Sequence, residues 1–277
     1  MNFEFKNIIY RKKLENKVLE IEINKAVTTI WLNLPEKHNA LNALMINELT
    51  AVFAKLSDDT HTRVVVIRGR GKSFCAGADL NYMKEIASFG EEENKNDAIR
   101  LATLFSTINS CSKPVIAMLH GAVYGGANGL AAACDIVLAD ENTTFAFSEV
   151  KIGISPATIS PFVLAKCGEA AARDLMLTGR RFDAIEAEKY SLVNKIVNES
   201  NGEQTLTSYC NQLLSAAPGA VSRTKNLIHE LQSQSMNQEE TMNFTAALIA
   251  SQRAATEGQE GITAFFEKRK PNWFQEL

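Results

Sequence analysis

The sequence predicts an α/β core followed by a helical C-terminal region. In the first half, short apolar runs rich in β-branched residues alternate with segments of helical periodicity. These runs are residues 64–67, 115–118 and 136–139. Beyond residue 161 the helical pattern dominates, and a single further strand is expected at residues 192–197. We therefore expect an α/β core over residues 1–200 and a helical oligomerisation region over residues 201–277.

The individual elements follow from local patterns. Two β-rich runs, residues 18–23 and 27–34, are separated by a short turn and predict an opening hairpin. A stripe of apolar residues at helical spacing then indicates an amphipathic helix: Leu41, Leu44, Met45, Leu49, Val52, Phe53 and Leu56. A second stripe ends before Pro114 and consists of Ala98, Leu101, Ala102, Phe105 and Ile108. The later helices are expected at residues 161–180, 184–191, 203–232 and 238–256.

The composition is that of an ordinary globular protein. Of 277 residues, 45% are hydrophobic and 22% are charged, which is enough to bury a large core. The net charge of −3 argues against nucleic acid as a partner. No apolar run is long enough to span a membrane, and the charged residues 1–13 do not resemble a secretory signal. The five scattered cysteines form neither a disulfide framework nor a metal site, so we expect a cytoplasmic protein without a metal.

Two glycine-rich segments follow predicted buried strands and bring backbone N–H groups to the edge of the sheet. They span residues 69–80 and 120–135, and each leads from a strand into a helix. Unpaired N–H groups at a helix start lie at the positive end of the helix dipole, where they bind anions or polarised carbonyls. The alternative for each segment is a tight turn, or close helix packing, that requires glycine for its geometry.

A third segment places a carboxylate in an apolar stretch. The neighbours of Glu149 are Phe147, Val150, Ile152 and Ile154. Poor solvation raises the pKa of a carboxyl group and suits it to proton transfer near neutral pH. The alternative is a surface glutamate paired with the adjacent Lys151.

Six segments together resemble the crotonase (enoyl-CoA hydratase/isomerase) family in their order and spacing. They are residues 34–41 (LPEKHNAL), 73–80 (SFCAGADL), 121–135, 177–182 (LTGRRF), 187–193 and 260–271. The resemblance covers nearly the whole chain and implies the fold of that family, a spiral of β-β-α units with C-terminal helices. It also implies an acyl-CoA thioester substrate and assembly as a homotrimer or a dimer of trimers. Coenzyme A is then part of the substrate, and no separate cofactor is expected.

The same resemblance implies roles for particular residues. The backbone N–H groups of Ala78 and Gly126 would hold the thioester oxygen and stabilise the charge of an enolate. Glu149 would be the catalytic acid and base. Coenzyme A would lie against a further set of residues: Lys37, His38, Ala40, Ala76, Asp79 and Leu80.

One position departs from the pattern of the best-known hydratases. Those enzymes resemble this chain at Glu149 but carry another glutamate where this sequence has Gly129. We expect reversible hydration of a 2-enoyl-CoA, with a water beside Gly129 held by Glu149 and by Asn128 or a substrate group. The alternative is a Δ3-Δ2-enoyl-CoA isomerase, in which Glu149 alone moves a proton between Cα and Cγ.

A narrower resemblance concerns the substrate. Residues 148–163 resemble a branch of bacterial proteins assigned to 3-methylglutaconyl-CoA hydration in leucine breakdown, and that branch also tends to lack the first glutamate. Two other classes of protein remain as alternatives. One is a non-catalytic acyl-CoA-binding protein, and the other is a serine peptidase built from Ser148, His120 and Asp135. No G-x-S-x-G elbow surrounds Ser148, which argues against the peptidase.

Overall fold

The main sheet has six strands in the order β1-β2-β3-β4-β6-β9. The structure is a computed structural model that describes residues 18–277. The prediction that residues 1–13 are not a secretory signal concerns residues outside this range. The predicted hairpin is present as the antiparallel pair β1 (Leu19–Asn24) and β2 (Val27–Leu32). The remaining strands all run parallel to β2: β3 (Val64–Gly69), β4 (Val115–Leu119), β6 (Ile136–Asp140) and β9 (Lys195–Val197).

A second, three-stranded sheet has the order β5-β7-β8 and was not predicted. Its strands are β5 (Ala122–Tyr124), β7 (Thr144–Ala146) and β8 (Arg181–Asp183). After β4 and again after β6, the chain adds one short strand to this sheet and then enters a helix. The helices of these two turns are α4 (Gly126–Ala133) and α5 (Ser160–Thr178). This repeat is the expected spiral of β-β-α units.

Helices cover both faces of the main sheet, which explains why residues 64–67 of β3 and all of β4 are continuously apolar. Val65 and Ile67 of β3 pack into the larger core with α1 (Ala43–Asp58), α3 (Glu91–Asn109) and α4. Val64 and Val66 point to the opposite face, where they join a core with α7 (Gly202–Ser215). The face toward α1, α3 and α4 is the one that positions the site.

The first predicted helix begins two residues later than its apolar stripe. Leu41 forms an isolated parallel bridge with Ala78, and the side chain of Asn42 caps α1 by accepting a hydrogen bond from Met45 N. The predicted stripe of α3 is also shifted, because Asp97 and Leu104 are buried while Ala98 is exposed. The remaining short elements are η1 (Pro35–Lys37), α2 (Leu80–Ile86), η2 (Ser148–Ile152) and α6 (Ala184–Lys189).

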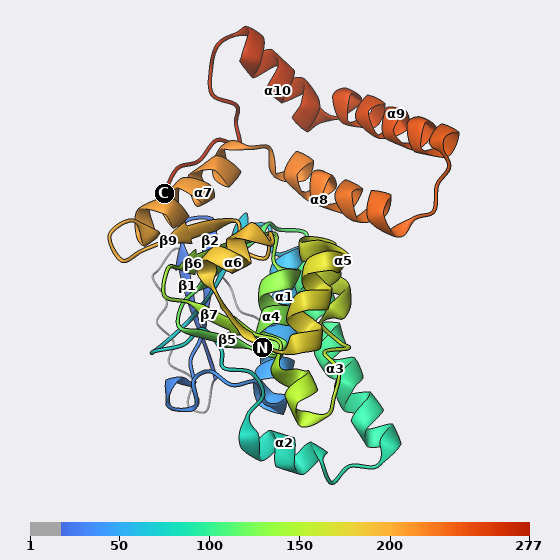
Figure 1. The fold of residues 1–277 in the computed structure, drawn as a ribbon. Coiled ribbons are helices and arrows are strands. Elements are labelled where there is room, and N and C mark those ends of the chain that lie inside the picture. Colours follow the sequence, from blue (N-terminus) through green and yellow to red (C-terminus); the bar gives the residue numbers. More distant parts are fainter. Residues whose placement is uncertain (1–17) are drawn as a thin grey trace.

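The last three helices project from the body as an arm (Figure 1). They are α8 (Pro218–Ser233), α9 (Gln238–Ala254) and α10 (Thr256–Phe266). The single helix expected over residues 203–232 is divided into α7 and α8, because Pro218 starts a new helix rather than continuing the old one. Since α7 packs on the sheet, the projecting arm begins at Pro218.

The C-terminal tail returns from the arm to the body. Gln275 N donates to Leu214 O at 3.3 Å, and Leu277 N donates to Asn211 Oδ1 at 2.8 Å. Within residues 18–277, no helix is both long and apolar enough to cross a membrane. All five cysteines are free.

Candidate active site

The loop before α2 presents an unpaired backbone donor at Ala78. Leu41 N donates to Gly77 O at 2.7 Å, and Asp79 N donates to Leu41 O at 2.8 Å. In this parallel bridge Ala78 is the paired residue, so its own N–H points away from Leu41. Among the described residues, no acceptor is assigned to that N–H. Ala78 is exposed, and its N–H is therefore free to bind an oxygen from a ligand.

The start of α4 presents a second unpaired donor. Gly126 is the first residue of the helix, and its N–H has no acceptor in the described part of the chain. The preceding residue, Gly125, has φ 52° and ψ −126°, a conformation that favours glycine. This turn directs the N–H of Gly126 out of the helix at the positive end of its dipole.

Glu149 lies beside the glycine turn that precedes this donor. It belongs to η2, and a Cβ atom placed on Gly125 would lie 3.3 Å from its Oε1. A side chain at residue 125 would therefore crowd the carboxylate. Oε2 of Glu149 is buried and has no hydrogen-bond partner among the described residues. A buried carboxylate oxygen without a partner is unusual in a folded protein and is consistent with a group that acts on a ligand.

Burial raises the pKa of the Glu149 carboxyl above its ordinary value, as predicted from the sequence. The apolar neighbours expected to cause this are only partly responsible, because Ile152 and Ile154 are more than half exposed. Phe147, in contrast, is fully buried. No ion pair between Glu149 and Lys151 is present in the described structure, so the interpretation as a paired surface glutamate does not hold.

This raised pKa gives a stability prediction for Glu149→Gln. As pH rises, the unfolded chain releases the Glu149 proton before the folded protein does. The contribution of Glu149 to the stability of the fold is therefore fully present below the ordinary pKa of 4.5 and is lost as pH rises through the folded-state pKa. Glutamine has no such dependence. The quantity to compare is the melting temperature of Glu149→Gln minus that of the wild type. We expect this difference to be larger near neutral pH than below pH 4.5. A difference that is constant with pH, measured by differential scanning calorimetry, would contradict the raised pKa.

The structure corrects the expectation of a water beside Gly129. A Cβ atom on Gly129 would lie 2.4 Å from Cγ2 of Ile159 and 2.7 Å from Cζ of Phe105. Both side chains are buried and apolar. The place where a second carboxylate was considered is thus filled by hydrocarbon.

The Nδ2 group of Asn128 does not face the space beside Gly129. Its side chain is fully buried, and Nδ2 donates to Gly125 O at 3.2 Å and to Ala146 O at 2.9 Å. The amide therefore faces the backbone of the glycine turn rather than an open space.

The residues proposed to contact coenzyme A cluster around the loop that carries Ala78. Lys37 Nζ lies 2.9 Å from Oδ2 of Asp79, and this hydrogen bond lowers the pKa of the Asp79 carboxyl. The other carboxylate oxygen of Asp79 caps α2. Ala76 N donates to His38 O at 3.0 Å. Leu80 is 75% exposed, whereas Ala40 is buried.

Asn39 holds the segment of residues 34–41 to the loop of residues 69–80, and it was not among the site residues predicted from the sequence. Its Oδ1 accepts from Leu34 N at 2.8 Å, and its Nδ2 donates to Arg70 O and Ser73 O, each at 2.8 Å. Asn39 is fully buried and has φ 54°. A position that needs a left-handed backbone and a short amide favours asparagine, and this was the available signal within the segment LPEKHNAL.

The residues considered for a serine peptidase are not brought together. Ser148 is exposed, His120 Nε2 lies 3.0 Å from Gly71 O, and Asp135 pairs with Lys225 at 2.7 Å. Ser148, His120 and Asp135 therefore form no catalytic triad, and the peptidase alternative built from them is wrong.

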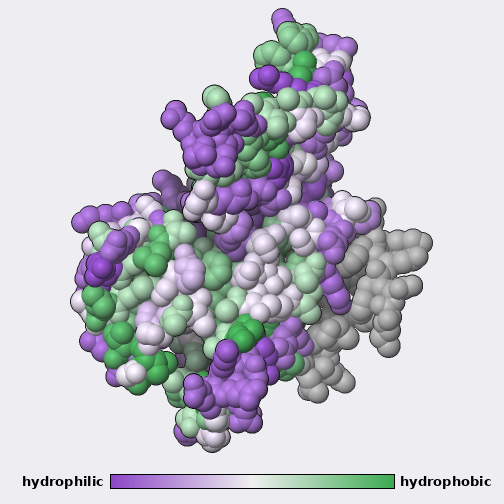
Figure 2. Space-filling model, turned by 90° about the vertical axis from the view of Figure 1, so that its right-hand side faces the viewer, coloured by the Kyte–Doolittle hydropathy of each residue, from purple (hydrophilic) through white to green (hydrophobic). Residues whose placement is uncertain are grey.

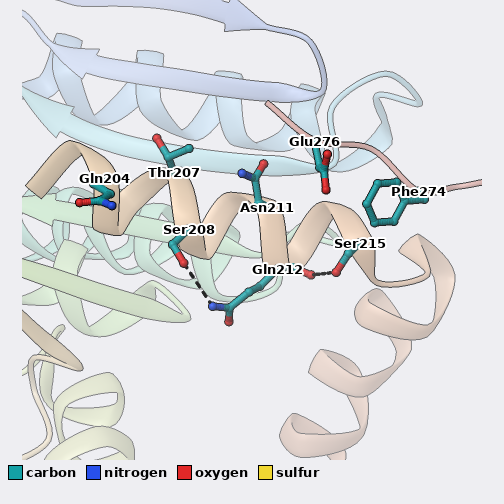
Figure 3. Close-up of a pocket in the computed structure, with 8 residues that line it drawn as sticks. All are labelled: Gln204, Thr207, Ser208, Asn211, Gln212, Ser215, Phe274 and Glu276. Atoms are coloured by element: carbon teal, nitrogen blue, oxygen red, sulfur yellow. Dashed lines mark hydrogen bonds between the residues drawn. The ribbon is translucent and has the colours of Figure 1, made fainter. Parts of the chain in front are cut away.

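Two surface cavities of about 460 Å³ lie away from the proposed site. One is a polar groove between α7 and the C-terminal tail (Figure 3), lined by Gln204, Thr207, Ser208, Asn211, Gln212, Ser215, Phe274 and Glu276. The other lies under α8 and includes Lys225, Ile228 and His229. Neither contains Ala78, Gly126 or Glu149, so cavity size alone does not identify the chemistry of this protein.

Comparison with known proteins identifies the family. The sequence pattern of the family described as enoyl-CoA hydratase/isomerase matches residues 22–276. The chain belongs to this family, which confirms the resemblance of the six segments and, with it, the crotonase-like fold.

Individual relatives agree with this assignment. The short-chain-enoyl-CoA hydratase of Clostridium acetobutylicum is 32% identical over 265 residues, which cover 95% of this chain and 99% of that protein. The crystal structure of an enoyl-CoA hydratase from Shewanella pealeana matches with a TM-score of 0.90 at 37% identity, over 94% of this chain and 97% of that one. Pseudomonas aeruginosa AtuE matches with a TM-score of 0.89 at 35% identity, over 94% and 100% of the two chains.

Proposed function

We propose that this protein adds water reversibly to the double bond of a 2-enoyl-CoA, with Glu149 as its single acid/base. One observation carries the proposal: the carboxylate of Glu149, with one oxygen buried and unpartnered, lies against the glycine turn that presents the free N–H of Gly126. Relatives named as enoyl-CoA hydratases support hydration as the reaction.

The proposed chemistry uses one proton and one pair of donors. The Glu149 carboxylate takes a proton from a water as the water oxygen bonds to Cβ of the thioester. The electrons of the double bond move onto the thioester oxygen, where the N–H groups of Ala78 and Gly126 stabilise the enolate charge. Protonated Glu149 then gives its proton to Cα and is regenerated. A raised pKa helps it to hold that proton between the two steps.

The binding of the rest of the substrate is part of the proposal. Coenzyme A would lie along the loops that contain Lys37, His38 and Asp79, which the buried Asn39 holds together. For the acyl group we propose 3-methylglutaconyl-CoA, which would place the enzyme in leucine degradation. The support for this is the resemblance of residues 148–163 to the corresponding bacterial branch.

A second candidate is favoured by one specific observation. Phe105 and Ile159 keep the space at Gly129 apolar, and an enzyme that moves a proton between Cα and Cγ benefits when water is excluded from the reacting carbons. Isomerisation of a 3-enoyl-CoA to a 2-enoyl-CoA would use the same Glu149 and the same donors.

Turnover in ¹⁸O-labelled water separates the two reactions. The purified protein is offered crotonyl-CoA, a 3-enoyl-CoA and 3-methylglutaconyl-CoA, and the products are examined by mass spectrometry. We expect a 3-hydroxyacyl product labelled at C3, with the highest kcat/KM for 3-methylglutaconyl-CoA. Clean conversion of the 3-enoyl-CoA, with no label and no 3-hydroxyacyl product from any 2-enoyl substrate, would establish the isomerase. Binding of all three without turnover would leave only the non-catalytic acyl-CoA-binding protein.

We also propose that the protein assembles as a homotrimer or a dimer of trimers through the arm. Among the described residues of α8 and α9 none is buried, and the arm exposes Ile228, Leu231, Met242, Ile249, Ile262, Phe265 and Phe266. Figure 2 shows hydrophobic patches along this arm. Exposed apolar surface of this kind marks association sites. The five free cysteines support the cytoplasm as the proposed compartment.

A further inference from the structure

Asn128 is a fully buried polar residue in a helix of small and apolar residues. Its Nδ2 lies 3.2 Å from Gly125 O and 2.9 Å from Ala146 O. Both neighbours are carbonyl acceptors, so the side chain must present its two N–H donors to them. Its Oδ1 consequently points elsewhere, where it is buried and has no partner in the described part of the chain.

The two carbonyls that it binds belong to the two halves of the proposed active site. Gly125 forms the turn that aims the N–H of Gly126. Ala146 ends β7, three residues before Glu149. The turn and the strand also meet directly, because Gly125 N donates to Ala146 O at 2.9 Å. Asn128 therefore connects the segment of the oxyanion donor with the segment of the acid/base.

Satisfying these carbonyls does not require the side chain. Gly125 O already accepts from Asn128 N at 2.9 Å, and Ala146 O already accepts from Gly125 N. An apolar side chain of similar size would leave both carbonyls with a partner and would remove the unpartnered Oδ1. For folding alone, asparagine is therefore a poor choice at this position.

We propose that Asn128 is a positioning residue, which fixes the N–H of Gly126 relative to the Glu149 carboxylate without touching the substrate. The inference rests on the proposed function, because its effect is measured on the turnover of an enoyl-CoA. Small displacements of catalytic groups are costly: an error of about 1 Å lowers rates by about a hundredfold. Loss of the Asn128 amide should therefore reduce kcat and leave substrate binding unchanged.

Valine and threonine give a matched pair of variants at this position. The valine and threonine side chains have nearly the same shape. In a helix, however, the threonine hydroxyl donates to the carbonyl three or four residues earlier. For residue 128, the carbonyl three residues earlier is Gly125 O. We expect Asn128→Val to lower kcat by about ten- to a hundredfold, with KM and melting temperature near wild type. Asn128→Thr restores one of the two bonds, and its kcat should lie clearly above that of the valine variant.

The outcomes separate positioning from a purely structural role. Equal kcat values for the wild type and Asn128→Val would overturn the proposal. The proposal would also be overturned if kcat and melting temperature fall together while KM rises, to the same extent in the valine and the threonine variants. If Asn128→Val does not fold, Asn128→Leu provides the apolar variant, because the leucine side chain branches at Cγ as the asparagine side chain does. Wild-type protein without turnover on any enoyl-CoA would instead count against the proposed function. The wild type is therefore assayed before any variant is compared with it.

Discussion

Glu149→Gln is expected to lower turnover by about two to four orders of magnitude, which is the range that general acid/base groups contribute. The amide has almost the shape of the carboxyl group but cannot accept and return a proton. Oε2 of Glu149 makes no hydrogen bond in the described structure, so the substitution removes none there. The fold and the affinity for an acyl-CoA should therefore be retained. Initial rates on the best substrate, together with calorimetric binding of a product thioester, measure both effects.

Ser148→Ala is the matched control for this prediction. Ser148 is adjacent to Glu149 in η2 and is exposed. Its hydroxyl has no role in the proposed reaction, so this variant should have wild-type kcat. A Glu149→Gln enzyme that keeps more than about a tenth of the wild-type rate would show that another group is the acid/base.

Gly126→Pro is expected to lower kcat by at least about a hundredfold, which corresponds to roughly 3 kcal/mol of transition-state stabilisation. Proline removes the N–H of residue 126, the proposed donor to the enolate oxygen. The first position of a helix is the one that tolerates proline best, so α4 should still form. Steady-state kinetics, with circular dichroism and thermal melting on the same samples, provide the comparison.

Gly126→Ala separates the lost donor from the added bulk. Alanine keeps the N–H, and its Cβ would lie 3.2 Å from Cδ1 of Leu41, the end of a flexible side chain that can shift slightly. We expect this variant to retain most of the wild-type kcat. If alanine and proline reduce kcat equally while both proteins stay folded, the effect is steric and Gly126 N–H is not an oxyanion donor.

The main architecture could be predicted because its signals are local and repeated. The hairpin β1-β2, the buried strand β3 and the helix α5 all appear near the expected residues. The second sheet could not be predicted, because strands of three residues such as β5 and β7 are too short to show a period. The break before Pro218 was also missed, although proline at a helix start is a readable signal.

Within the site, the sequence was informative about single residues and wrong about the space between them. Glu149 has the raised pKa that its apolar setting predicted. The prediction of a water beside Gly129 was wrong, because the space left by the absence of a side chain at residue 129 was assumed to be empty. Ile159 and Phe105 fill it, and these residues are distant from Gly129 in sequence. Asn128 likewise faces Gly125 O and Ala146 O, a contact set by the tertiary fold.

The central claim is that one carboxylate, Glu149, carries the proton to Cα beside two backbone N–H donors. Deuterium transfer from ²H₂O to C2 of a 2-enoyl-CoA, followed by mass spectrometry for the wild type and Glu149→Gln, measures this step directly. We expect one deuterium at C2 for each turnover of the wild type, and labelling slower by about two to four orders of magnitude in the variant. Labelling of C2 by Glu149→Gln at the wild-type rate would contradict the claim.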